Sequence, residues 1–174
     1  MVDKPSDREK MNAGWRMGRE HAEDILSIIH QIKKGADVPI WVVGTSMGTF
    51  SAANAAIRLK SEVSGLGLTS TITKSHKKWA IRHSHPKAVI DMALENISVP
   101  SLIVSHKGDE CSITPASDSE SLKKKLKNAK NVQVILFEGD HAPVSDPCEA
   151  LSQHGFYGIE QEVVDAIAHF IKSN

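Results

Sequence analysis

The sequence lacks the features that would direct a protein to a membrane or to nucleic acid. No apolar stretch approaches the ~20 residues that a transmembrane helix needs, and the charged N-terminal segment Met1–Arg8 has no apolar core of the kind found in a signal peptide. The 21 basic side chains equal the 21 acidic ones, so net charge gives no electrostatic reason to bind nucleic acid or an anionic membrane. The sequence as it stands therefore predicts a cytoplasmic protein that uses neither partner.

Cysteine is scarce, since the chain contains only Cys111 and Cys148. Two cysteines without a signal peptide are typical of free thiols in a cytosolic protein. Histidine is frequent, and His76, His83 and His85 lie close together in the sequence. No cysteine or acidic cluster accompanies these histidines at the spacing of metal ligands. We therefore expect no metal site.

The chain also has no internal repeat and no low-complexity linker, and its 174 residues are the length of one domain. Four short runs rich in Val, Ile and Leu predict strands covered on both faces, and helical patterns separate them. This alternation predicts an α/β fold, a three-layer parallel sheet with helices on both faces. The predicted strands are 38–43, 63–68, 101–105 and 132–137; the predicted helices are 20–34, 49–60, 114–127 and a terminal helix that contains Val163, Val164, Ile167 and Ile171.

Residues 69–99 fit this alternation poorly. They combine basic and histidine side chains with a helical stretch near residues 86–96. We interpret residues 70–98 as a small insertion above the strand ends, within a single domain that spans residues 1–174.

The segment Gly44-Thr45-Ser46-Met47-Gly48 has the pattern G-x-S-x-G. The pattern alone is weak, because a chain of this length contains it by chance about once in twenty cases. Here it directly follows a predicted strand and directly opens an Ala-rich helix, which is the setting that an exposed nucleophilic serine requires. Glycine at both ends avoids clashes in the tight turn, and the helix N-terminus favours an oxyanion. We predict that Ser46 is a nucleophile; a glycine-rich turn without chemistry is the alternative.

A serine nucleophile needs a base, and the base needs an acid that orients it. Asp109 lies just beyond the C-terminal end of the third predicted strand, where catalytic groups gather in open α/β sheets, and Glu110 is its neighbour. Two histidines follow later in the chain. Loop length after the last strand favours His141, whereas the distance to the terminal helix favours His154. The residues by themselves leave the base open between these two.

The order serine, acid, histidine resembles that of the α/β-hydrolase superfamily. Residues 40–49 look like its nucleophile strand and elbow, and residues 99–104 look like the strand that leads to the acid. His154-Gly155-Phe156 is similar to the sequence around the catalytic histidine of dienelactone-hydrolase-like members. The resemblance covers the chain from about residue 18 to the end, favours His154 over His141, and implies acyl hydrolysis without a cofactor.

The resemblance also gives the cysteines a role. Cys111 lies two residues after the predicted acid, and Cys148 lies six residues before His154. A Cys111–Cys148 disulfide would fasten the acid loop to the histidine loop. A disulfide would in turn place the protein in the periplasm or outside the cell.

The chain departs from the family at its N-terminus. Family members have about four strands before the nucleophile strand, whereas only some 37 residues precede Val38 here. The segment 3–7 looks like the loop after the last of those strands. The chain thus resembles an α/β-hydrolase that lacks its N-terminal strands, and with them the second oxyanion amide. The Met47 N–H is the one donor that can be assigned. The missing strands are consistent with a truncated gene product, with a fragment, or with a reduced fold that a homo-oligomer completes; an unpaired edge at the first strand would favour the homo-oligomer.

These expectations combine into one predicted function: a serine hydrolase that cleaves a small or medium carboxylic ester through an acyl-enzyme. Ser46 attacks, His154 transfers the proton, Asp109 orients the imidazole and Met47 contributes to the oxyanion hole. Two alternatives remain. One is an impaired or non-catalytic α/β-hydrolase-like domain that binds a ligand, and the other is a thioesterase or amidase.

Overall fold

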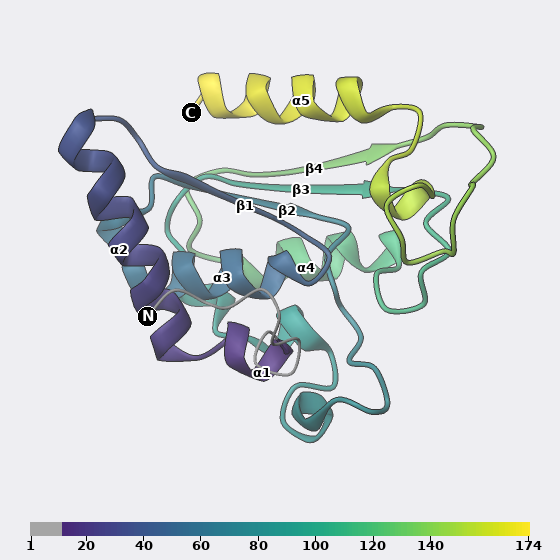
Figure 1. Cartoon of the computed structure of the whole chain (residues 1–174), viewed down its shortest axis with the longest axis horizontal. Coiled ribbons are helices and arrows are strands. Elements are labelled where there is room, and N and C mark those ends of the chain that lie inside the picture. Colours follow the sequence, from purple (N-terminus) through teal and green to yellow (C-terminus); the bar gives the residue numbers. More distant parts are fainter. Residues whose placement is uncertain (1–11) are drawn as a thin grey trace.

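Four parallel strands form the centre of the molecule (Figure 1). The structure is a computed structural model, and it describes residues 12–174; the segment 3–7 lies outside them. The strands occur in the sheet in the same order as in the chain, and each pairs in parallel with the next. They are β1 (Trp41–Thr45), β2 (Gly65–Thr69), β3 (Ser101–His106) and β4 (Val132–Phe137).

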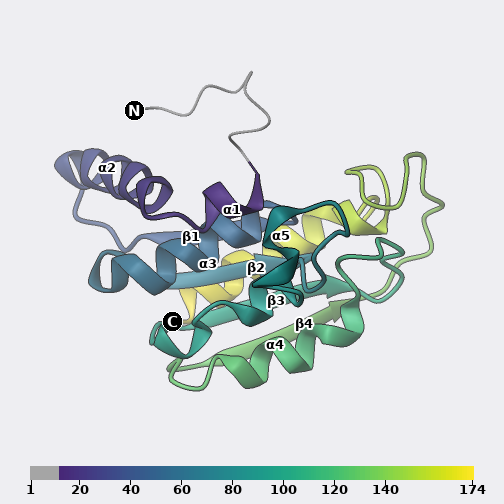
Figure 2. The same ribbon diagram turned by 90° about the horizontal axis from the view of Figure 1, so that it is seen from below.

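This sequential order decides which face each connection covers. Right-handed crossovers between neighbouring parallel strands all run over the same face of a sheet. Accordingly α3, α4 and the segment between β2 and β3 lie together on one face, and α5, which follows the last strand, covers the opposite face (Figures 1 and 2). The predicted three-layer α/β architecture is confirmed. The helices are α1 (Ala13–Arg16), α2 (Arg19–Gly35), α3 (Gly48–Leu59), α4 (Ser119–Lys125) and α5 (Glu160–Lys172).

Two elements begin three or more residues later than predicted. Residues 38–40 are not part of a strand, because pairing with β2 begins at Trp41, opposite Gly65. The predicted helix at 114–127 is wrong at its start: Pro115 has an extended backbone, a short 3-10 turn occupies Ala116–Asp118, and α4 begins only at Ser119. Thr114 does not cap this helix, because its hydroxyl bonds to Asp109 instead.

Residues 70–98 form the crossover between β2 and β3 and belong to the core. Their helical turns are short 3-10 segments at Ala80–His83, Ala88–Asp91 and Leu94–Asn96, not the longer helix expected near 86–96. Their apolar side chains pack with α3 in the larger hydrophobic cluster, where Ile72, Val89, Leu94 and Ile97 are fully buried. The segment therefore fills space beneath the sheet and does not lie only above the strand ends.

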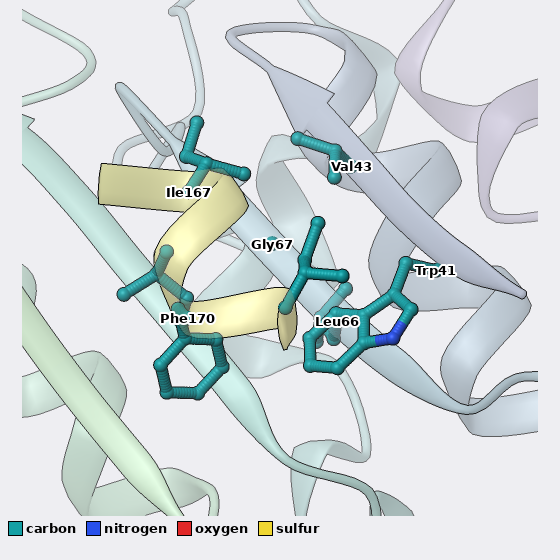
Figure 3. A pocket seen from close by; sticks show the side chains of 8 residues that line it. Trp41, Val43, Leu66, Gly67, Ile167 and Phe170 are labelled. Carbon is teal, nitrogen blue, oxygen red and sulfur yellow. The ribbon is translucent and has the colours of Figure 1, made fainter. Parts of the chain in front are cut away.

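The face under α5 is covered less completely than the other. A smaller cluster joins this helix to β3 and β4, and Phe170 meets Trp41 edge to face at 5.7 Å. The Trp41 ring lies over Gly65 so closely that a side chain there would collide with it. Near β1 a shallow apolar hollow remains, which Figure 3 shows between α5 and the strands, and Val43 beside it is 47% exposed.

Candidate active site

Ser46 lies in a sharp turn between β1 and α3. Its φ of 51° is in the left-handed region that non-glycine residues rarely occupy. The turn is held by a hydrogen bond of 3.1 Å from the Ser46 N–H to the Thr69 carbonyl and by two bonds from Thr49 to the Ser46 carbonyl. The Ser46 side chain therefore stands at the carboxyl end of the strand on a strained backbone, as the G-x-S-x-G pattern predicts.

The two glycines of the motif have different reasons to be there. A Cβ at Gly44 would overlap the carbonyl group of Gly48, so only glycine lets the strand and the helix approach this closely. A Cβ at Gly48 would meet nothing within 4 Å. The expectation that both glycines avoid clashes therefore holds for Gly44 and is wrong for Gly48.

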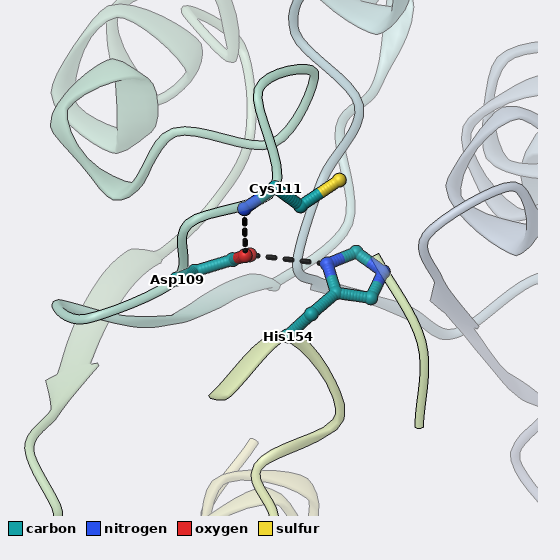
Figure 4. Close-up of side chains that lie close together, drawn as sticks. All are labelled: Asp109, Cys111 and His154. Atoms are coloured by element: carbon teal, nitrogen blue, oxygen red, sulfur yellow. Dashed lines mark hydrogen bonds and ion pairs between the residues drawn. The ribbon is translucent and has the colours of Figure 1, made fainter. Parts of the chain in front are cut away.

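Asp109 and His154 form a buried pair at the carboxyl end of β3 (Figure 4). Asp109 Oδ2 lies 3.1 Å from His154 Nδ1, and the two side chains are 0% and 5% exposed. The backbone N–H of Cys111 donates to Asp109 Oδ1 at 2.9 Å. An aspartate in this position favours the protonated Nδ1 and leaves Nε2 as the free ring nitrogen.

His154 is held through its backbone as well as its ring. It lies in the 3-10 turn Gln153–Gly155, where the Ser152 hydroxyl accepts from the His154 N–H. The Ser70 hydroxyl, just after β2, donates to the His154 carbonyl at 2.6 Å. Because the Ser46 N–H bonds to Thr69, the end of β2 connects the nucleophile turn to the histidine turn. Within residues 12–174, no hydrogen bond joins the Ser46 hydroxyl to His154 itself.

His141 and Glu110 are placed differently from His154 and Asp109. His141 is exposed, and its ring packs against Tyr157 at 6.4 Å. Its carbonyl accepts from the Gln153 side chain, and its ring makes no hydrogen bond to Asp109. Glu110 is exposed as well. The structure thus brings His154, and not His141, to Asp109.

The disulfide between Cys111 and Cys148 is present, as the resemblance implied, and the simpler expectation of two free thiols is wrong. It connects the loop that carries Asp109 to the loop 138–151. Cys111, Asp109 and His154 also form the one candidate metal cluster among the described residues, with ligand atoms within 4.8 Å of one another. Because the Cys111 sulfur is bonded to Cys148, it cannot serve as a thiolate ligand, so the disulfide-bonded form does not fit a metal.

His106 at the end of β3 is a buried neighbour of this site. Burial lowers its pKa, while the nearby Asp109 and Glu138 oppose the shift. Its Nδ1 accepts the Gly108 N–H at 3.0 Å. A hydrogen bond and ion pair with Lys107 lower the pKa of Glu138. His106 thus contacts the acid loop through the N–H of Gly108.

Thr114 is the site residue that sequence reasoning missed. It is 1% exposed, and its hydroxyl contacts both Asp109 and His154. The dipeptide Thr114-Pro115 carries a strong helix-start signal, and nothing in the local pattern distinguishes a helix cap from a side chain directed into a site.

No family model matches the chain, and no curated protein matches it. Comparison with solved structures does give similar folds. A monoacylglycerol lipase from Paleococcus ferrophilus matches with a TM-score of 0.61 and 19% identity, over 88% of this chain and 74% of the lipase. Est1E from Butyrivibrio proteoclasticus matches with a TM-score of 0.62 and 19% identity, over 87% of this chain and 68% of Est1E.

A third structure, described with the metagenome-derived lipolytic enzymes LipS and LipT, matches with a TM-score of 0.63 and 12% identity, over 94% of this chain and 78% of that one. These identities are too low to transfer an activity, but the shared architecture covers most of the chain. Among residues 12–174, no helix has the length and apolar character to cross a membrane. By its similarity to these solved structures, the chain has an α/β-hydrolase fold. It spans about two thirds to four fifths of their length.

Proposed function

We propose that the protein is a serine hydrolase that cleaves a small or medium carboxylic ester through an acyl-enzyme. The observation that carries this proposal is the buried Asp109–His154 pair, joined through the end of β2 to a serine in a strained strand-to-helix turn. The order of the three residues in the chain matches the order in the fold that the solved structures share. The lipase and the lipolytic enzymes among those structures support an ester as substrate.

In the proposed mechanism, His154 acts as the base. With Asp109 accepting from Nδ1–H, the free Nε2 takes the proton of Ser46 as its oxygen attacks the ester carbonyl. The imidazolium then donates that proton to the departing alcohol, which leaves an acyl-Ser46. A water molecule, deprotonated in turn by Nε2, attacks the acyl group. The bond from the acyl carbon to Ser46 Oγ then breaks, the imidazolium returns the proton to Oγ, and the acid is released. Asp109 stays ionised and stabilises the imidazolium throughout.

The Met47 N–H is the proposed donor to the oxyanion. Met47 precedes the first residue of α3, and no backbone carbonyl among the described residues accepts from its N–H. Free N–H groups and the helix dipole at this end stabilise developing negative charge. We assign one donor of the oxyanion hole to Met47, and loss of such a donor costs about 10²–10³ in turnover.

The disulfide bears on where the protein works. A disulfide persists in oxidising compartments such as the periplasm or the cell exterior, and is rare in the reducing cytosol. We infer that the active form belongs to an oxidising compartment. Alkylation of thiols in freshly lysed cells tests this inference, because a cytosolic protein would show two alkylated cysteines.

Hydrolysis of p-nitrophenyl acetate and butyrate tests the function directly. We expect Ser46→Ala to lower kcat/KM by a factor on the order of 10⁴ or more, because the nucleophile is lost. A fluorophosphonate probe should label the native protein at Ser46 and leave the variant unlabelled. Absence of both hydrolysis and labelling in the folded native protein would favour a binding domain over an enzyme.

The two histidines provide a matched pair for the base. His154→Ala should lose activity to the same extent as Ser46→Ala, since the members of a triad act as a unit. His141→Ala removes an exposed ring that makes no contact with Asp109, and it should retain activity within about twofold. The reverse result would assign the base to His141.

A further inference from the structure

Thr114 completes a closed triangle with Asp109 and His154. Its Oγ1 lies 2.8 Å from Asp109 Oδ2 and 3.1 Å from His154 Nδ1, and these two atoms lie 3.1 Å apart. All three side chains are removed from solvent. We propose that Thr114 is a positioning residue that keeps His154 in the Nδ1–H tautomer and keeps the Asp109 carboxylate turned toward it. This inference rests on the proposed function.

Counting hydrogen atoms shows why the triangle selects one tautomer. The threonine hydroxyl has a single hydrogen, and an ionised carboxylate can only accept. The shortest contact of the hydroxyl, at 2.8 Å, is to Asp109 Oδ2, so the hydroxyl donates there. Its oxygen must then accept from His154 Nδ1, which requires a proton on Nδ1.

The other tautomer leaves the triangle one hydrogen short. If Nδ1 were unprotonated, the hydroxyl could donate to Nδ1 or to Asp109 Oδ2 but not to both. Two buried acceptors would then face each other at 3.1 Å without a hydrogen between them, which is costly in a site that excludes water. Asp109 alone already disfavours the tautomer that would block Nε2. Thr114 adds to this preference, because its oxygen is a second acceptor for Nδ1–H and its one hydrogen, donated to Asp109, is not available to an unprotonated Nδ1.

The backbone fixes Thr114 in this position. Its N–H bonds to the Cys111 carbonyl at 3.0 Å, and the Cys111 N–H bonds to Asp109 Oδ1. The acid and its threonine partner thus belong to one tight turn, residues 109–114, which the disulfide at Cys111 connects to the loop preceding His154. Rotation of the Asp109 carboxylate would break bonds to both Cys111 and Thr114.

The test compares Thr114→Val with Thr114→Ser and with Thr71→Val. Valine keeps the shape but removes the hydroxyl, and serine keeps the hydroxyl. Thr71 is a matched control, because it is also buried and its hydroxyl has no hydrogen-bond partner among the described residues. We expect Thr114→Val to lower kcat about tenfold with little change in KM, and Thr114→Ser to restore kcat to within about twofold of the native value.

Nitrogen-15 NMR of labelled histidine gives a readout that does not depend on ester hydrolysis. We expect neutral His154 in the native protein and in Thr71→Val to be the Nδ1–H tautomer. In Thr114→Val the Nδ1 proton should exchange with water at least about tenfold faster. An Nε2–H tautomer in the native protein overturns the proposal even if the valine variant does not fold.

The two readouts separate the failure of this inference from failure of the proposed function. Unchanged proton exchange and unchanged kcat in Thr114→Val would overturn the positioning role while leaving the hydrolase intact. A serine variant as impaired as the valine variant would also overturn it, because packing and not the hydroxyl would then matter. A native protein without esterase activity, but with a protected Nδ1–H that Thr114→Val exposes, would refute the proposed function alone.

Discussion

The proposed nucleophile comes from a strand at the border of the sheet, whereas the proposed acid and base come from loops that are bonded to each other. Ser46 follows β1, where Val43 is 47% exposed and an apolar hollow adjoins the strand. Asp109 and His154 follow the interior strand β3 and the last strand β4, and their side chains are almost fully buried. Catalysis by this site requires the two halves to be held in a fixed relative position, but the fold supports each half by different interactions.

The acid–histidine half is supported by bonds outside the regular elements. A disulfide, the Thr114 hydroxyl and the Ser70 hydroxyl hold two loops that have little secondary structure. The nucleophile half depends instead on the close approach of β1 to α3 at Gly44. Substitutions in the two halves should therefore change the free energy of unfolding and the esterase activity by different amounts.

The largest effect on stability is expected from loss of the disulfide. Cys111 and Cys148 are separated by 37 residues, and a link across a loop of that length stabilises the fold by about 4 kcal/mol in the chain-entropy description. Cys148→Ser, which leaves the buried Cys111 in place, should lower the free energy of urea unfolding by up to that amount. It should also lower esterase activity, because the histidine loop loses its connection to the acid loop.

Reduction of the native protein with dithiothreitol is the companion measurement. It should reproduce the loss of stability in the native protein and have no further effect on Cys148→Ser. Equal urea midpoints for oxidised and reduced native protein would show that the hydrogen bonds alone hold the acid–histidine half.

The two glycines of the elbow test the nucleophile half. Gly44→Ala places a Cβ against the Gly48 carbonyl and the Ala52 side chain, so we expect a loss of about 3 kcal/mol in unfolding free energy. Gly48→Ala is the matched control: its Cβ meets open space at the first residue of α3. Alanine there should leave stability unchanged or raise it by up to about 1 kcal/mol.

Thermal unfolding of both variants distinguishes the outcomes. If Gly44→Ala were as stable as Gly48→Ala, the strand and helix would be less closely packed than the structure shows. If Gly48→Ala alone lost esterase activity, open space at that position would serve the substrate and not the fold.

The smallest effect concerns the exposed border at β1. We propose that a second copy of the chain pairs with this strand about a two-fold axis, since an open apolar edge favours pairing. Val43→Lys should weaken a dimer in sedimentation equilibrium but change monomer stability by no more than about 0.5 kcal/mol. Val144→Lys, at a loop position that is 65% exposed, is the control and should dimerise normally. A native protein that is monomeric at 100-fold higher concentration than the assay contradicts the pairing.

Local patterns predicted the strands and most of the helices because each signal is local. Strand β4 occurs at the predicted residues, and α2 and α3 differ from prediction by one residue at each end. The failures occur where a distant partner overrides local preference. Thr114 and Pro115 have the local pattern of a helix start, but the Thr114 hydroxyl donates to the buried Asp109 carboxylate instead. The local pattern of residues 70–98 predicts an insertion, although their apolar side chains fill the core under β2 and β3.

The sequence by itself determined the α/β class, the elbow around Ser46 and the candidates for acid and base, since glycine spacing and strand–helix alternation are properties of neighbouring residues. Only the tertiary structure decided that His154 and not His141 meets Asp109, because both follow β4 and the local signals disagree: loop length favours His141, and the distance to the terminal helix favours His154. It also decided that the two cysteines pair and that Thr114, which contacts Asp109, also contacts His154. The physical reason is that these contacts join residues 37 to 45 positions apart, and the folding of the loops above the sheet sets which of them meet.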